Sequence, residues 1–87
     1  MAEPSAALTA LGAVVRRLRQ ERDMSQWELS ERAGIHKNTP GLIERGERSP
    51  ALETINAIAH ALDLRGSELL RLAEDHAQTH VEPEGTR

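Results

Sequence analysis

Apolar positions recur at helical spacing in separate stretches of this chain, and each stretch predicts one helix. Leu11, Val15 and Leu18 follow one another at intervals of four and three residues, which places them on one face of a helix over about 8–22. The opposite face of this stretch is basic and polar. A second, shorter helix is expected over about 26–33, with Leu29 on its buried face.

Local signals mark both ends of this second helix. Ser25 and Glu28 have the spacing of a capping box, in which each side chain accepts a hydrogen bond from the other residue's backbone amide. Gly34 follows the last expected helical residue, and glycine adopts the left-handed conformation of a helix ending without a steric penalty. The second helix is therefore expected to run from just after Ser25 to just before Gly34.

Pro40 restricts where a third helix can begin. Proline inside a helix removes a backbone hydrogen bond and costs about 3 kcal/mol, but it is favoured in the first turn. We therefore expect Thr39 as the N-cap, a short helix over about 40–45, and Ile43 facing the core. The turn that leads into this helix then holds His36, Lys37 and Asn38.

Two further helices complete the pattern. Ser49 and Pro50 are expected to start the fourth helix, whose apolar positions within 52–62 share one face. A fifth helix is expected to open near Gly66. Its apolar positions are Leu69, Leu70, Leu72 and Ala73.

These elements predict an all-α fold, a compact five-helix bundle. Between Ser25 and Gly46, helix, glycine turn and helix follow within about twenty residues, which is the helix-turn-helix layout. We expect one folded domain over 8–76. Residues 1–7 are expected to be a flexible N-terminus, and 77–87 a disordered acidic tail.

Composition narrows the class of protein. With 87 residues the chain makes one small domain, and Trp27 is its single aromatic residue, so the core must be aliphatic. The chain has no cysteine, which excludes disulfides and thiolate metal sites and fits a reducing, cytoplasmic compartment. No apolar run approaches the roughly 18 residues of a membrane span, and the first residues do not resemble a signal peptide, so no membrane association is expected.

The distribution of charge matters more than its total. The net charge of −3 argues against a simple nucleic-acid binder. Residues 12–50, however, carry eight basic and six acidic groups, whereas 51–87 carry three basic and seven acidic groups. The basic excess coincides with the helix-turn-helix, and this polarity could orient the molecule on DNA.

Three stretches of the sequence carry a family resemblance. They are LGAVVRRLRQERDMSQWELSERAGI, GLIERGERSPALETINAIAHALDL and SELL, and together they resemble the Cro/C1-type (Xre-like) helix-turn-helix DNA-binding domain over about 11–72. The resemblance implies a lambda-repressor-like bundle of five helices with the third helix in the DNA major groove. Small stand-alone members of this family include controller proteins of restriction-modification systems, and the size of this chain fits them.

The resemblance also implies roles for single residues. Gln26 would contact a DNA phosphate, which suits the free amides and positive dipole of a helix N-terminus. Base edges would be reached from the start of the third helix, and lysine and asparagine suit guanine and adenine there. The DNA-binding residues expected on this basis are Gln26, His36, Lys37, Asn38, Thr39, Leu42, Arg45 and Arg48. Arg19 and Glu44 match a structural pair that bridges the first and third helices.

The chain departs from the family pattern at two positions. Pro40 stands where the family usually has a branched apolar residue, which affects how Lys37 and Asn38 are presented. Ala51 stands where a Ser or Thr usually caps the fourth helix, a role that Ser49 could take instead.

The sequence as a whole predicts a sequence-specific DNA-binding transcriptional regulator that acts as a homodimer on a palindromic operator, with double-stranded DNA as its partner. Symmetry would double the contacts that one short helix can make. The fifth helix is the expected dimer interface, since it carries more apolar side chains than one buried stripe needs. The residues expected there are Leu69, Leu70, Leu72 and Ala73.

Two other functions stay open. An antitoxin-like protein would bind a partner protein and autoregulate, which the acidic tail and the fifth helix favour. An interaction module that has lost DNA binding is favoured by Pro40 and the pI near 5.8.

Catalytic motifs are missing from the sequence. It has no cysteine, no Gly-x-Ser-x-Gly and no phosphate-binding loop. His76 and His80 are four residues apart, but two histidines alone do not form a metal site. We therefore expect no enzymatic activity, no metal site and no cofactor.

Overall fold

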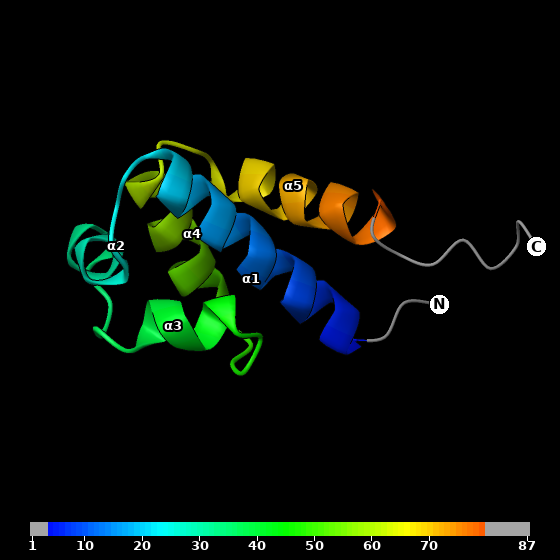
Figure 1. The fold of residues 1–87 in the computed structure, drawn as a ribbon, viewed down its shortest axis with the longest axis horizontal. Helices are drawn as coiled ribbons and strands as arrows, with labels where there is room; N and C mark the ends of the chain where they lie inside the picture. The colour runs from blue at the N-terminus through cyan, green and yellow to red at the C-terminus, as the bar shows by residue number, and fades with distance from the viewer. Residues whose placement is uncertain (1–3, 80–87) are drawn as a thin grey trace, which may run out of the picture.

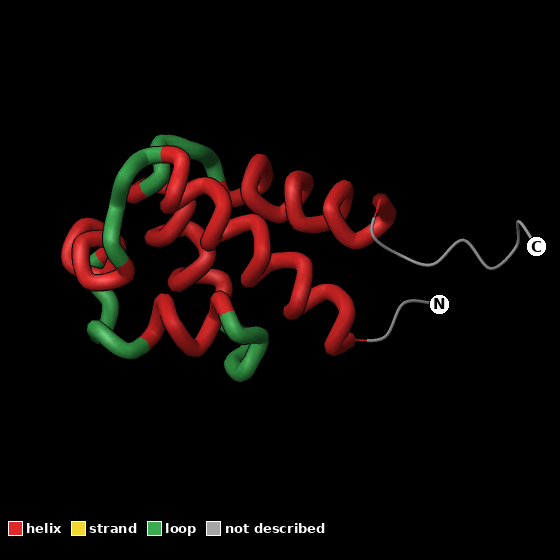
Figure 2. The backbone as a smooth tube through the Cα atoms, in the orientation of Figure 1, coloured by secondary structure: helices red, strands yellow, loops and turns green. Residues whose placement is uncertain are grey.

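Five α-helices make up most of residues 4–79, which are the residues that the computed structural model describes (Figure 1). They are α1 (Pro4–Glu21), α2 (Gln26–Ala33), α3 (Thr39–Glu44), α4 (Leu52–Ala61) and α5 (Gly66–Thr79). Helices α1 and α5 pack side by side, while α2, α3 and α4 gather toward the end of the molecule opposite the first turn of α1 and the last turn of α5 (Figures 1 and 2). No strand occurs within residues 4–79, so the predicted all-α five-helix bundle is confirmed.

The core is aliphatic and draws on all five helices. Val14 of α1, Leu29 of α2 and Ile43 of α3 are at most 1% exposed. From α4 and α5, Ile58 and Leu69 are buried to the same extent. Burying each such side chain contributes about 2 kcal/mol, so packing, and not local propensity, holds these short helices in place.

The ends of α2 are as the sequence predicts. The backbone N–H of Glu28 donates to Ser25 Oγ at 3.0 Å, and the backbone N–H of Ser25 donates to Glu28 Oε1 at 2.9 Å. The hydrogen bond from the Ser25 amide stabilises the carboxylate and lowers the pKa of Glu28. Gly34 ends the helix in the left-handed conformation with φ of 70°.

The four helices α1 to α4 end in the same way. Each end has a residue with positive φ, followed by an amide that donates to the carbonyl five positions back, as in a Schellman motif. The residues with positive φ are Asp23, Gly34, Gly46 and Asp63. The closing bonds are Met24 N–Arg19 O at 3.0 Å, Ile35 N–Ser30 O at 3.0 Å, Glu47 N–Leu42 O at 2.9 Å and Leu64 N–Ala59 O at 2.8 Å. These compact endings let successive helices follow within a few residues.

The terminal helices extend beyond the predicted domain limits. Helix α1 begins at Pro4, so residues 4–7 of the predicted N-terminus are helical in the structure. Proline is favoured in a first turn, and the two alanines that follow it are strong helix formers. Helix α5 runs to Thr79, three residues past the expected limit. The rest of the predicted termini, 1–3 and 80–87, lies outside the described residues.

The start of α4 also differs from the prediction. Helix α4 begins at Leu52, and its N-cap position is Ala51, whose backbone is extended with φ of −68° and ψ of 161°. Within the described part of the chain, no side chain caps this helix, so Ser49 does not take the role expected of it. The reason is spacing, because Ser49 lies two residues before the cap position that the backbone adopts.

Gly12 allows α1 and α3 to approach closely. A Cβ atom placed on Gly12 would collide with the carbonyl oxygen of Ile43 and lie 2.7 Å from that of Glu44. Both carbonyls are backbone groups near the end of α3 and cannot rotate away. Glycine at this position therefore sets the distance between the two helices.

We predict that Gly12→Ala destabilises the fold by about 2 kcal/mol, the usual cost of overpacking against a rigid neighbour. Urea unfolding followed by circular dichroism measures the change. Gly66→Ala is the matched control, because the added Cβ there meets the side-chain amide of Asn56, which can move. Equal stability of the two variants would contradict the close approach.

Candidate nucleic-acid interface

A buried ion pair joins α1 to α3. Arg19 Nε donates to Glu44 Oε2 at 2.7 Å, and Arg19 Nη2 donates to Glu44 Oε1 at 3.0 Å. The two side chains are only 12% and 4% exposed. Arg19 Nη1 also donates to the carbonyl oxygen of Met24 at 2.8 Å, so one guanidinium fixes α3 and the loop before α2 together.

Gln26 extends this network to the start of α2. It is the first residue of α2, and its Nε2 donates to Glu44 Oε1 at 3.0 Å. The hydrogen bonds with Glu44 raise the pKa of Arg19 against the opposing effect of burial, so the guanidinium stays charged at all physiological pH values. The hydrogen bond from Gln26 to Glu44 thus fixes the position of the N-terminus of α2 relative to α3.

Helix α3 accommodates Pro40 without losing a hydrogen bond. Pro40 lies in the first turn, where its missing N–H would have no helical partner, and its side chain is fully buried. Asn38, and not Thr39, occupies the N-cap position, and its side chain makes no cap hydrogen bond within the described structure. Thr39 is the first helical residue and is 6% exposed, so little of its side chain is open to solvent. The expectation that Thr39 is the cap is thus corrected, and its contact with DNA stays a prediction.

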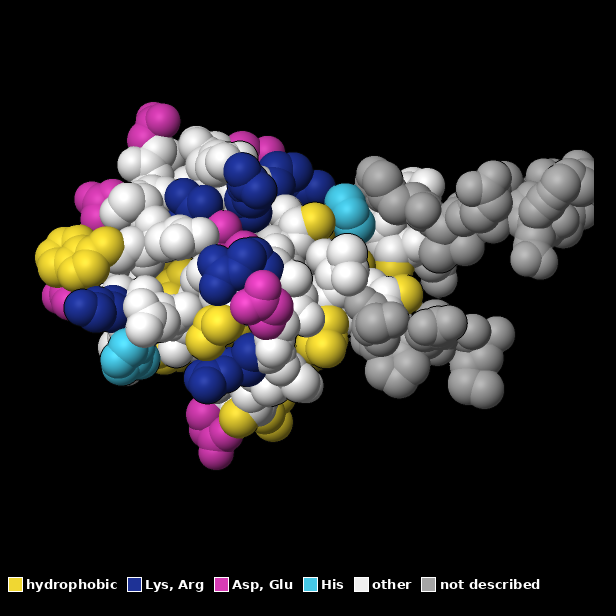
Figure 3. Space-filling view, turned by 60° about the horizontal axis from the view of Figure 1, so that its bottom comes forward, with side chains coloured by type: hydrophobic (Ala, Val, Ile, Leu, Met, Phe, Trp, Pro, Cys, Tyr) yellow, Lys and Arg dark blue, Asp and Glu magenta, His cyan; other side chains and the backbone are white. Residues whose placement is uncertain are grey.

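The other expected contact residues occupy one region around α3. His36, Lys37 and Asn38 are exposed in the turn before α3, and Leu42 is half-buried on the helix. Arg45 and Arg48 are exposed after the helix. The face that contains α3 carries several Lys and Arg side chains across its middle, with acidic ones between them (Figure 3).

The side chains of Gln26 and Arg45 both approach Gly41 of α3. A Cβ placed on Gly41 would lie 3.3 Å from Gln26 Oε1 and 3.0 Å from Arg45 Nη1, so both side chains lie over this glycine. Arg45 also pairs with the exposed Glu47, its Nε lying 3.0 Å from Glu47 Oε2. The guanidinium of Arg45 at the end of α3 is thus exposed, but the carboxylate of Glu47 partly neutralises its charge.

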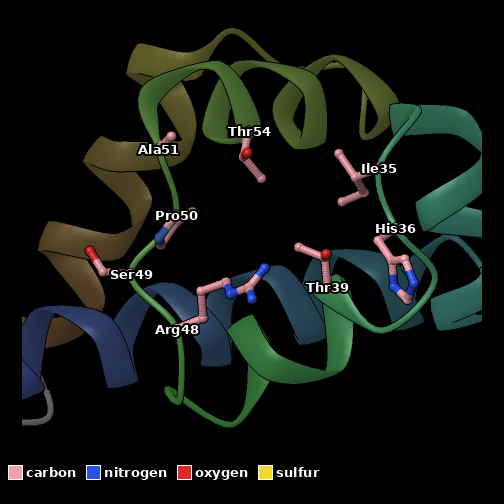
Figure 4. A pocket seen from close by; sticks show the side chains of 8 residues that line it. All are labelled: Ile35, His36, Thr39, Arg48, Ser49, Pro50, Ala51 and Thr54. Atoms are coloured by element: carbon pink, nitrogen blue, oxygen red, sulfur yellow. The ribbon is translucent and has the colours of Figure 1, made fainter.

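A hollow of about 480 Å³ opens beside the start of α3 (Figure 4). His36 lies at one side of it, Arg48 and Pro50 at the other, Thr39 on α3 and Thr54 on α4 (Figure 4). Its full lining is Ile35, His36, Thr39, Arg48, Ser49, Pro50, Ala51 and Thr54. The contribution of Ala51 and Thr54 could not be predicted from the sequence, because only the packing of α4 against the preceding turns brings them to this hollow.

The apolar residues of α5 divide between core and surface. Leu69 is 1% exposed and Ala73 is 7% exposed, so both belong to the core of the protomer. Little of either side chain is left for a partner chain, and their place in a dimer interface stays a prediction. Leu70 is 38% exposed and Leu72 is half-buried, so these two remain as candidate interface residues.

Neither a metal-binding group nor a membrane-spanning helix is found among residues 4–79. Within residues 4–79 no group of three or more His, Cys, Asp or Glu side chains could hold a metal ion. His80, one of the two histidines considered above, lies outside the described residues. None of the helices described here is long and apolar enough to cross a membrane.

Comparison with known proteins gives consistent matches. A family model described as helix-turn-helix matches residues 15–69. The transcriptional repressor RstR of cryptic phage CTXphi from Vibrio cholerae is 38% identical over 60 residues, which cover 69% of this chain and 54% of that protein. The control protein C.SmaI of Serratia marcescens is 38% identical over 56 residues, which cover 64% of this chain and 67% of that protein. This chain spans about half the length of the Vibrio repressor and 42% of that of the immunity repressor of Bacillus phage phi105.

Solved structures share the fold. The restriction-modification controller protein C.AhdI from Aeromonas hydrophila superposes with a TM-score of 0.69 at 35% identity, covering 71% of this chain and 94% of that one. The clp gene regulator ClgR from Corynebacterium glutamicum superposes with a TM-score of 0.81 at 24% identity, covering 92% of this chain and 85% of that one. The second likeness concerns the fold alone.

We predict that Arg19→Leu destabilises the protein by about 3 kcal/mol, because it leaves the carboxylate of Glu44 buried without its partner. Replacing both residues by leucine should recover most of this loss. Arg17→Leu is the matched control, because Arg17 and Glu21 form an exposed pair at 3.7 Å, a kind worth less than about 1 kcal/mol. Urea unfolding of the four proteins measures the differences, and an Arg19→Leu variant as stable as Arg17→Leu would refute the bridging role.

Proposed function

The chain belongs to the Cro/C1-type helix-turn-helix family, a family of DNA-binding transcription regulators and not of enzymes, and on that premise we propose that it is a transcriptional regulator that binds a palindromic operator as a homodimer. The proposal includes the side chains that would touch DNA and the surface that would join two protomers.

The observation that carries the proposal is the division of residues around α3. Thr39, Pro40 and Ile43 are buried against the other helices, while Lys37 and Asn38 are exposed just before them. Both exposed side chains are suited to base edges, lysine to the acceptors of guanine and asparagine to the paired groups of adenine. A helix end fixed in the core thus holds two polar side chains outward.

Phosphate contacts would surround these two base-reading residues. Gln26 lies at the N-terminus of α2, where free amides and the helix dipole favour an anion. Arg45 and Arg48 are exposed beyond the other end of α3. Contacts of this kind fix the register of a protein on DNA, and those with cations make binding depend on salt.

Dimerisation would use the exposed part of α5. Leu70 is a large apolar side chain that is 38% exposed, whereas Leu72, two residues on, lies on another face of the helix and is half-buried against the core. A two-fold interface repeats the same surface on both chains, so a single exposed leucine contributes twice. Two protomers related in this way would read half-sites about one helical turn of DNA apart.

Selection of bound sequences from a random DNA pool tests the proposed function. We expect the wild type to enrich a palindromic motif, and Lys37→Ala/Asn38→Ala to lose or relax the preference at some positions. Each base contact of this type contributes about 1–3 kcal/mol, so the relaxation should be roughly tenfold or more. Arg65→Ala/Ser67→Ala, at exposed positions near the start of α5, is the control and should keep the motif. Absence of any enrichment at low salt by folded protein would sink the proposal.

The dimer surface is tested by Leu70→Glu. Two charges placed opposite one another in an apolar interface should dissociate the dimer and weaken operator binding by roughly a hundredfold, because the second half-site contact is lost. Analytical ultracentrifugation measures the mass, and DNA titration measures the affinity. Leu52→Glu, at a leucine of α4 that is 65% exposed, is the control for mass and should stay dimeric. An unchanged mass for Leu70→Glu would place the interface elsewhere.

A further inference from the structure

The turn before α3 is closed twice by one residue, His36. The backbone N–H of Thr39 donates to the carbonyl oxygen of His36 at 2.9 Å. The backbone N–H of Asn38 donates to the imidazole Nδ1 of His36 at 3.0 Å. The amides of Asn38 and Thr39 are thus both satisfied by the same residue.

This second contact holds the N-cap residue of a helix that lacks a side-chain cap hydrogen bond in the described structure. The N-cap position, Asn38, has a helical backbone with φ of −86° and ψ of −12°, and its side chain caps nothing within the described structure. Pro40 contributes no N–H. The imidazole accepts the amide two residues on, which is the geometry that Asn and Asp side chains form in an Asx-turn.

The contact fixes the protonation state of the ring. An imidazole nitrogen that accepts a hydrogen bond carries no proton, so the proton of neutral His36 lies on Nε2. An imidazolium has a proton on both nitrogens and cannot accept the Asn38 amide. The turn in the form seen here therefore requires neutral His36.

The side chains that depend on this turn are the candidate base readers. Lys37 and Asn38 lie between His36 and the first residue of α3, so the turn, and not the helix, sets their direction. The charged group that lines the hollow together with His36 is Arg48, while α3 and α4 contribute Thr39 and Thr54 there. Lys37 is the charged neighbour in the chain, and no acidic residue is among the described residues of the lining.

We propose that His36 is a positioning residue whose neutral imidazole closes the turn before α3 and so directs Lys37 and Asn38 toward DNA. The proposal rests on the proposed function. It differs from a direct contact of His36 with DNA in what can replace the histidine. Asparagine can accept the Asn38 amide in the same way and should restore the turn, whereas it would not reproduce a cationic histidine on a phosphate.

The test compares wild type, His36→Ala and His36→Asn in titrations of the selected DNA at pH 7.5, with salt held constant. Asparagine can accept the same amide from the same position. We expect His36→Ala to bind roughly tenfold more weakly than wild type, the effect of about one hydrogen bond. His36→Asn should bind nearly as tightly as wild type.

His60→Asn is the matched control for the loss of a histidine elsewhere. His60 is exposed on α4, and its replacement should leave the affinity unchanged. Circular dichroism shows whether every variant is folded. His36→Ala as tight as wild type, or His36→Asn as weak as His36→Ala, would overturn the proposal.

A second measurement needs no DNA. In the free protein, ¹⁵N chemical shifts of the His36 ring should report Nε2–H at pH 7.5, and exchange of the Asn38 amide should speed up in His36→Ala but not in His36→Asn. A protonated Nδ1 or an unchanged exchange rate in His36→Ala would overturn the proposed contact. If wild type binds no DNA, both the proposed function and the role of His36 in DNA binding are wrong. The measurement in the free protein still decides whether the imidazole closes the turn.

Discussion

The buried ion pair between Arg19 and Glu44 is the constraint on which the DNA-facing side of this small fold depends. Helix α3 has six residues, far fewer than the roughly twelve at which isolated helices become even marginal in water. Its position must therefore come from tertiary contacts. Two hydrogen bonds from Arg19, one from Gln26 and the close approach at Gly12 supply those contacts. Removing the charge at either end would leave a polar group buried, so the pair also specifies one packing of α1 against α3.

The outer surface follows from this arrangement. With Thr39, Pro40 and Ile43 packed inward, the side chains suited to base contacts are left in the turn before α3, and the arginines in the segment after it. Pro40 fits this arrangement because it fills the core as a branched apolar residue would and needs no hydrogen bond in the first turn. The backbone before α3 is then held by the imidazole of His36, so a residue of the turn supports the residues that we propose read DNA.

Local signals made much of this fold predictable from the sequence. The capping box at Ser25 and the left-handed Gly34 depend on neighbours within a few residues, and the structure confirms both. The predictions of Thr39 as a cap and of Ser49 as the start of α4 were wrong, because the backbone begins these helices at Thr39 and Leu52 and so places the cap positions at Asn38 and Ala51. Leu69 and Ala73 show a related limit. The apolar stripe of one helix does not show which of its residues are buried within the protomer. The hollow beside α3 could not be predicted either, because part of its lining comes from α4.

Backbone amide NMR during titration with a selected operator duplex tests the central claim most directly, with a scrambled duplex of the same composition as the reference. The account predicts that shifts specific to the operator concentrate at Gln26, in residues 36–39 and in residues 45–48. The operator-specific shifts at these positions should persist when raised salt removes those common to both duplexes, because base contacts, unlike phosphate contacts, distinguish the two sequences. Shifts confined to α5, or identical for both duplexes, would contradict the claim that the region around α3 reads DNA sequence.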